Sequence, residues 1–386
     1  MNLLILNARL ITPERILTGY SLLIEKTKIK KIMPPGRSGG LKKKGYILLD
    51  VRGDYVAPGL IDIHIQGYKG HDVWEKRPYS PRDMSRKLLL SGTTSYLATT
   101  HYDEGVINNI IRSLPGQSRE ESEILGLHLE GPFINPRRLG MIPGRSIRKF
   151  SREFFYEHIA PVSKRIKLMT IAPELEGAAA LIRELKRSGT FISMGHSRAG
   201  YQEAIDGFNL GISQVTHIFN AMEPLHHREP NAITAALLDP RIYVQVIADG
   251  IHLHPAVLNM ILKLKGPDRI ILITDAVKAA GFKKGVFFND GLKVKLEHGA
   301  VRGPDGSLAG SSLTLLEAVK NMMKFTSVSL KDAFKMATFV PASSIRIQKK
   351  KGEISPGKDA DLIILDHNLK LKKVVKSGEV FNVKKN

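Results

Sequence analysis

Residues that can bind a metal ion or carry a proton recur along this chain at the ends of short apolar runs. They are histidines, carboxylates and side-chain amides: His64, Gln66, His101, Glu130, Glu174, His196, His217, Asn220, Asp249, His252 and Asp275. Neutral imidazoles and carboxylates are ligands of divalent metals, and both groups exchange protons. One such residue is commonly a hydrogen-bonded core or loop group, but a series of them predicts metal-assisted chemistry at a shared site.

The apolar runs that precede these residues have the length and composition of buried strands. Eight of them lie between residues 60 and 277, and each is followed by a stretch long enough for a crossover helix. This alternation predicts an α/β fold, a (β/α)8 barrel. The carboxyl ends of all strands meet at one face of such a barrel, so the polar residues should converge there.

Strand-like segments at both ends of the chain lie outside this repeat, where short apolar runs alternate with turns. We expect these terminal segments to pair into one small β-sandwich beside the barrel. The sequence therefore predicts three parts: residues 1–55 as the N-terminal part of the sandwich, 56–348 as the catalytic barrel and 349–386 as the C-terminal part of the sandwich.

The composition excludes several kinds of chemistry and favours a location. The 386 residues include no cysteine, which rules out disulfides, thiolate metal sites and a cysteine nucleophile. Asn7 and Arg9 interrupt the first apolar run too early for a secretory signal, and no apolar run approaches the roughly 18 residues of a membrane helix. We expect a soluble, cytoplasmic protein.

The formal net charge of +21 has four possible explanations: binding to nucleic acid, binding to an anionic membrane surface, attraction of an anionic substrate, or a solvated lysine-rich surface. The basic residues are spread along the chain, and aromatic residues are not interleaved with them as in a groove for single-stranded nucleic acid. This distribution favours the solvated surface. We expect no specific nucleic acid and no membrane as partner.

Several longer motifs carry a resemblance to a known family. "PGLIDIHIQG", "GLHLEGPFINP", "GHSRA", "THIFNAMEPLHHREP", "ADGIHLHP", "ITDA" and "LAGSSLTL" occur in this order along the chain. In this order they resemble the N-acetylglucosamine-6-phosphate deacetylases of the amidohydrolase superfamily, over nearly the whole chain. The resemblance implies a metal-dependent enzyme that removes acetate from N-acetylglucosamine 6-phosphate, and it implies a homodimer.

The resemblance also implies the metal ligands and the catalytic group. Glu130, His196 and His217 match the family's principal ligands. One carboxylate and two imidazoles leave room for water and a substrate oxygen on one divalent ion. This set fits Zn²⁺, with Fe²⁺, Co²⁺ and Mn²⁺ as alternatives. Asp275 matches the family's catalytic aspartate, which takes a proton from the attacking water and passes it to the leaving amine.

The pair His64 and Gln66 departs from the His-x-His pattern that holds a second metal in many amidohydrolases. The amide oxygen of a glutamine is a weak ligand, so we expect one tightly bound ion per chain. His64 is then either a ligand of a weak second metal site or a residue that orients its neighbours.

The substrate-binding positions implied by the resemblance are Met141, Asn220, Ala221, Arg228, His252, Leu308, Ala309 and Gly310. Arg228 matches the family's phosphate contact, which can act across a dimer interface. The short segment Leu308 to Ser311 matches a loop that lines the sugar pocket.

Two departures leave alternatives open. Met141 and Ile142 stand where relatives have a small residue and a histidine that helps to polarise the acyl carbonyl. Polarisation would then fall to the metal or to another group such as His101. The alternatives to the deacetylase are an amidohydrolase acting on a related amide, such as N-acetylgalactosamine 6-phosphate, and a non-catalytic scaffold of the same fold.

Overall fold

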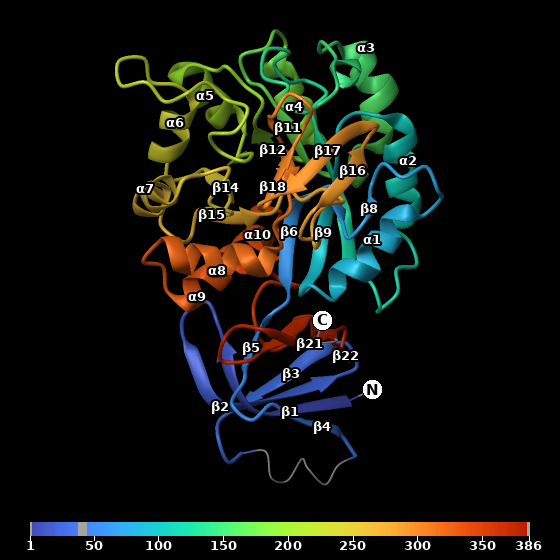
Figure 1. Ribbon diagram of the computed structural model, residues 1–386, viewed down its shortest axis with the longest axis vertical. Coiled ribbons are helices and arrows are strands. Elements are labelled where there is room, and N and C mark those ends of the chain that lie inside the picture. Colours follow the sequence, from blue (N-terminus) through green and yellow to red (C-terminus); the bar gives the residue numbers. More distant parts are fainter. Residues whose placement is uncertain (1, 38–44, 384–386) are drawn as a thin grey trace.

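The structure, a computed structural model, describes residues 2–37 and 45–383 of the chain. Figure 1 shows a barrel ringed by helices, and beside it a sheet that carries both chain termini. The predicted fold class is therefore confirmed. Within the described residues, three groups of strands matter for the site: the barrel, the terminal sheet and a small sheet near the barrel mouth.

Eight parallel strands form the barrel in the described part of the chain. In chain order they are β6 (Leu60–Ile65), β9 (Thr93–Thr100), β10 (Glu123–Glu130), β11 (Ile166–Ile171), β12 (Phe191–Met194), β13 (Gln214–Val215), β14 (Tyr243–Ile247) and β15 (Ile270–Ile273). Their side chains are mostly buried, as expected when helices cover the outer face. The barrel closes where the Asp275 N–H donates to the His64 carbonyl oxygen over 2.8 Å.

Helices follow the strands and surround the barrel (Figure 1). They are α1 (Ser80–Leu89), α2 (Glu104–Ser113), α3 (Arg152–Phe154), α4 (Ala178–Ser188), α5 (Tyr201–Leu210), α6 (Ala232–Leu238), α7 (Pro255–Lys265), α8 (Leu315–Phe325), α9 (Leu330–Met336) and α10 (Phe339–Ser344). Side chains that accept backbone N–H bonds fix several starts, as Asp103 does for α2 and Thr314 for α8. None of the helices in residues 2–37 and 45–383 combines the length and apolar character needed to cross a bilayer.

Strands from both ends of the chain share one sheet (Figure 1). They are β1 (Asn2–Ile11), β2 (Ile16–Glu25), β3 (Lys28–Met33), β4 (Ile47–Asp50), β5 (Tyr55–Pro58), β20 (Leu362–Leu365), β21 (Leu371–Lys376) and β22 (Glu379–Asn382). The two ends meet where β5 pairs with β20. The predicted sandwich is thus one hydrogen-bonded sheet that encloses its own apolar core, with Ile5, Ile24 and Leu362 among its buried members.

An antiparallel sheet is inserted between β15 and α8, close to the barrel mouth (Figure 1). Its strands are β16 (Gly285–Asn289), β17 (Leu292–Glu297), β18 (Ala300–Arg302) and β19 (Leu308–Ser311). A two-stranded piece, β7 (Gly67–Tyr68) with β8 (His71–Asp72), follows β6. The expectation that Leu308 to Ser311 form a loop was wrong, because these residues form the strand β19, which pairs with β18.

Candidate active site

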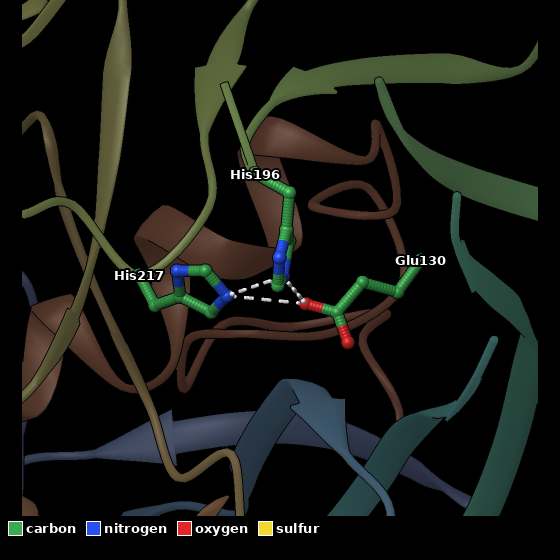
Figure 2. A group of neighbouring side chains, drawn as sticks. All are labelled: Glu130, His196 and His217. Carbon is green, nitrogen blue, oxygen red and sulfur yellow. Dashed lines mark hydrogen bonds and ion pairs between the residues drawn. The ribbon is translucent and has the colours of Figure 1, made fainter. Parts of the chain in front are cut away.

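Three predicted metal ligands meet at the mouth of the barrel, as Figure 2 shows. Glu130 ends β10, while His196 and His217 follow β12 and β13. Glu130 Oε1 lies 3.1 Å from Nε2 of each histidine, and the two Nε2 atoms are 3.2 Å apart. Strands distant in sequence therefore bring one carboxylate oxygen and two imidazole nitrogens to a common point.

The backbone turns sharply where these side chains leave the strands. His196, His217 and Asp275 have positive φ angles of 49°, 28° and 49°. Residues other than glycine rarely adopt this left-handed backbone conformation, because it is strained. Backbone strain of this kind is concentrated at functional sites. The turns direct the three side chains into the mouth instead of continuing the strand alternation.

The cluster fits a divalent metal ion. Ligand distances of about 2.1 Å in a tetrahedral site imply separations of about 3.4 Å between ligand atoms, close to those found here. Nδ1 of His196 lies 2.8 Å from the Arg138 carbonyl oxygen, which accepts a hydrogen bond from the Nδ1–H and leaves the Nε2 lone pair facing Glu130. A histidine held in this tautomer is ready to bind a metal.

The surroundings favour the metal-binding protonation states. Burial alone would raise the pKa of Glu130, but His64, His196 and His217 together hold that pKa well below its usual range. Burial also lowers the pKa of His217. An ionised carboxylate and a neutral imidazole are the forms that act as ligands.

Asp275 lies beside this cluster and is held by the two residues of the unusual His-x-Gln pair. The Gln66 Nε2–H donates to Asp275 Oδ1 over 3.0 Å, and His64 Nε2 lies 3.2 Å from the same oxygen. His64 Nε2 is also 3.5 Å from Glu130 Oε1. Gln66 therefore contacts the predicted catalytic group. Sequence reasoning treated Gln66 only as a weak metal ligand and missed this contact.

His64 itself lies beneath the mouth and is fully buried. Its Nδ1 is 3.4 Å from Gln245 Oε1, so the ring is held from below. Burial alone would lower the pKa of His64, but the Glu130 and Asp275 carboxylates outweigh it and raise the pKa well above its usual value. A protonated imidazole between two carboxylates favours the orienting role over the ligand role, because a metal ligand must be neutral.

Other strand-end residues brace the loops of the site. The Glu174 carboxylate accepts hydrogen bonds from Ser197 Oγ over 2.7 Å and from the Arg198 N–H over 2.6 Å, directly after His196. Asp249 Oδ2 lies 2.6 Å from His252 Nδ1 and so orients that ring. These carboxylates act on the loops and lie outside the metal cluster.

A cavity of about 260 Å³ opens above the cluster. Most of the predicted substrate-binding residues line it: Met141, Asn220, Ala221, His252, Leu308, Ala309 and Gly310. At Gly310, φ is +68° and an added Cβ would lie 2.6 Å from a Val277 methyl carbon, so only glycine fits there. The small residue lets the backbone form part of the wall.

Arg228 is the predicted substrate contact that the structure does not bring to this cavity. It lies exposed in the segment between Pro224 and Pro230, with Nη1 3.1 Å from His227 Nε2. Within its own chain it is not among the cavity-lining residues.

Sequence reasoning named His101 but missed its neighbours on one wall of the cavity. Trp74 stacks on His101, with ring centroids 5.4 Å apart, and both line the cavity together with Asn289 and Asp290 of the inserted sheet. The signal that could have found the inserted residues is the run "FFNDGLKV", an Asn-Asp-Gly turn between alternating apolar residues.

Comparison with known families places the fold and site in a class. The family model described as "Amidohydrolase family" matches residues 55–385. This range spans the barrel and the C-terminal strands of the terminal sheet.

Individual similar proteins identify the group within the amidohydrolase family. The chain is 37% identical, over 85% of each chain, to the N-acetylglucosamine-6-phosphate deacetylase of Bacillus subtilis. The crystal structure of that enzyme from Pasteurella multocida matches with a TM-score of 0.91 at 29% identity, covering 99% of this chain and 100% of the other. A Mycobacterium smegmatis mutant in complex with N-acetyl-D-glucosamine-6-phosphate matches at 26% identity with a TM-score of 0.88, covering 98% and 99%. The chain belongs to the amidohydrolase family and, within it, to the N-acetylglucosamine-6-phosphate deacetylases.

Proposed function

We propose that this protein hydrolyses N-acetylglucosamine 6-phosphate to glucosamine 6-phosphate and acetate. The observation that carries the proposal is the meeting of Glu130, His196, His217 and Asp275 at one cavity of about 260 Å³. The N-acetylglucosamine-6-phosphate deacetylase that is 37% identical supports the same reaction. A non-catalytic scaffold would have no use for a ligand cluster with an adjacent acid–base group.

Glu130, His196 and His217 would hold one divalent ion, for which Zn²⁺ is our first choice and Fe²⁺, Co²⁺ and Mn²⁺ are alternatives. Such an ion, when bound, polarises the acetamido carbonyl and lowers the pKa of water. The remaining chemistry falls to residues of the chain.

Asp275 is the proposed general base and then acid. Gln66 and His64 hold its Oδ1, so Oδ2 is left, among the described residues, to take a proton from the attacking water. Water adds to the acetamido carbon, and the C–N bond then breaks. The proton passes from Asp275 to the departing amine nitrogen, which leaves acetate and the free amino sugar as products.

The substrate is positioned by the lining residues, and its phosphate needs a cation that the cavity lacks. No Lys or Arg belongs to the lining formed by the described residues. We therefore propose that the protein is a homodimer in which Arg228, exposed on its own chain, binds the phosphate in the partner's site. Asn220 and His252 would contact the sugar or its acyl group.

We also propose the division into a sheet domain, residues 1–55 with 349–386, and a catalytic domain, 56–348. A cytoplasmic location follows from the proposed substrate, because a charged sugar phosphate does not cross a bilayer unaided.

Acetate release by the metal-loaded protein tests the function. The panel is N-acetylglucosamine 6-phosphate, its galactosamine epimer, and both unphosphorylated sugars. Fastest release from N-acetylglucosamine 6-phosphate is expected. Faster release from the epimer would change the substrate, and no release from any sugar would overturn the proposal.

Arg228→Ala tests the phosphate contact. Loss of one charge-assisted pair should raise KM for the phosphorylated sugar about 10- to 100-fold and leave the unphosphorylated sugar unaffected. Mixing Arg228→Ala with Asp275→Asn protomers should restore part of the activity if the arginine acts across the interface. Equal losses on both sugars would make Arg228 structural.

A further inference from the structure

The tip of the β16–β17 hairpin reaches the cavity with a geometry that its sequence dictates. Asn289 ends β16 and pairs with Leu292 of β17, so only Asp290 and Gly291 form the turn. Their φ angles are 44° and 82°, the signature of a type I′ turn, for which Asp-Gly is a preferred pair. This turn matches the twist of the strands and fixes where Asn289 points.

Asn289 faces inward and has a side-chain oxygen without a partner. Along β16 the side chains alternate, so that Phe288 is exposed whereas Asn289 is 9% exposed and lines the cavity. Among the described residues, Asn289 Oδ1 is buried and accepts no hydrogen bond. A buried amide oxygen without a partner is unfavourable, and such a group at a binding cavity indicates a contact that forms with the ligand.

The next residue anchors the tip. The Asp290 carboxylate forms an ion pair with Arg145 from the loop after β10, and its Oδ2 lies 3.3 Å from His101 Nε2 after β9. His101 is in turn stacked on Trp74, whose Nε1–H donates to Thr100 Oγ1 over 3.0 Å. The hairpin tip is therefore held by several other segments, and Asn289 is placed before any ligand arrives.

The neighbouring wall cannot supply the same contact. Met141 and Ile142 line the cavity with apolar side chains, and Met141 packs against the cluster that includes Val294 of β17. Leu292 and Val294, on the same hairpin, are also apolar. Asn289 and Asp290 are thus the polar residues of this hairpin that line the cavity, and Asp290 is already paired with Arg145 and His101.

We propose that Asn289 contacts the substrate and helps to set specificity, with its side-chain amide hydrogen-bonded to a hydroxyl or to the acetamido group of the bound amino sugar. Asp290 acts as a positioning residue that holds the tip through Arg145 and His101. This inference rests on the proposed deacetylase function and adds a contact from the inserted sheet.

Steady-state kinetics of the metal-loaded protein test the contact. Asn289→Ala should raise KM for N-acetylglucosamine 6-phosphate about 3- to 10-fold, with kcat within about twofold of wild type, because a ground-state contact is lost. Asn289→Leu, of similar size but unable to accept a hydrogen bond, should raise KM equally. Phe288→Ala, on the opposite face of the same strand, should leave KM unchanged.

Thermal unfolding separates this role from a structural one. Because Asn289 Oδ1 has no partner among the described residues, its removal should not lower the Tm of the substrate-free protein. Asp290→Asn should raise KM in the wild type and add nothing in the Asn289→Ala background, as expected for two residues that act together.

The outcomes distinguish the two proposals. An active wild type with unchanged KM in both Asn289 variants would overturn the contact alone. A lowered Tm with unchanged KM would make Asn289 structural. A wild type that releases no acetate would overturn the proposed function, and the inference that rests on it.

Discussion

The barrel has a cluster of buried charged groups at each end, and the two clusters are built differently. At the amino ends of the strands, toward the terminal sheet, Lys351 lies 2.8 Å from Glu123 and 3.2 Å from Asp359, and it also pairs with Asp361. Lys376 lies 2.7 Å from Asp361. Each carboxylate in this cluster has a cation beside it.

The cluster at the mouth contains no Lys or Arg among the described residues. Two carboxylates, Glu130 and Asp275, face three imidazoles, and within the described residues His64 Nε2 and His217 Nδ1 make no hydrogen bond. Glu123, Asp359 and Asp361 also lie close enough together to suggest a metal site, but their lysines already supply the positive charge. Carboxylates paired with lysines hold the fold together, whereas carboxylates that face imidazoles are ready to bind a metal.

The largest expected effect is a loss of activity when the mouth cluster is changed. Asp275→Asn keeps the shape of the side chain but cannot accept a proton, so kcat should fall about 10²- to 10⁴-fold. The Tm and the metal content should remain near wild type. Asp268→Asn is the control, because Asp268 is an exposed carboxylate outside both clusters and outside the cavity lining. A near-normal kcat in Asp275→Asn would mean that another group is the base.

A substitution in the lysine-paired cluster should lower stability and leave activity intact. Asp361→Ala leaves Lys351 and Lys376 buried with fewer carboxylates, so the free energy of unfolding should fall by about 3–5 kcal/mol. Urea unfolding measures it, with Asp268→Ala at an exposed ion pair as control. The remaining folded protein should keep its KM. A change below that of the control would show that the cluster contributes no stability.

Acid should weaken the same cluster. Burial would raise the pKa of Asp361, but Lys376 and Lys351 outweigh it and lower the pKa to about 2, from an ordinary 3.8. A depressed pKa stabilises the fold above the ordinary value, and this stability of about 2 kcal/mol is lost as pH falls from about 4 to about 2. Unfolding free energies of wild type and Asp361→Asn over this range should converge toward low pH. If the unfolding free energies of the two proteins stayed equally far apart at every pH, the pairing of Asp361 with the two lysines would be contradicted.

The smallest expected effect concerns the metal count. Wild type should retain about one tightly bound ion per chain after dialysis, and Gln66→His should approach two, because the new imidazole would lie beside His64 and Glu130. Loss of the Gln66 bond to Asp275 should lower kcat by no more than about tenfold. Metal analysis of both proteins, with Glu123→Gln as control, measures the number of bound ions per chain. Two ions in the wild type would contradict the single-metal site.

The sequence predicted the barrel and the meeting of its strand-end residues because both follow from strand alternation and parallel direction. Glu130, His196, His217 and Asp275 lie far apart in sequence, yet a closed parallel barrel brings the ends of their strands together. The contact between Gln66 and Asp275 depends on side-chain placement across the closing strands, which periodicity does not describe.

The inserted sheet shows where local patterns stop being informative. The Asn-Asp-Gly run predicts a turn, but the place where the hairpin packs depends on the contacts of Asp290 with Arg145 and His101. These three residues come from separate segments, and no spacing connects them. Likewise, the exposure of Arg228 depends on the conformation of its loop, which the residue type alone does not reveal.

The pairing of β5 with β20 has a consequence for how the protein is made. These strands are separated by about 300 residues, so a chain growing on the ribosome at about 5–20 residues per second exposes the edge of β5 for roughly 15–60 s before its partner is synthesised. Truncated products would keep that edge open, and open edges recruit other strands. The synthesis of β20 is thus a condition for closing the edge of β5 and for avoiding aggregation through it.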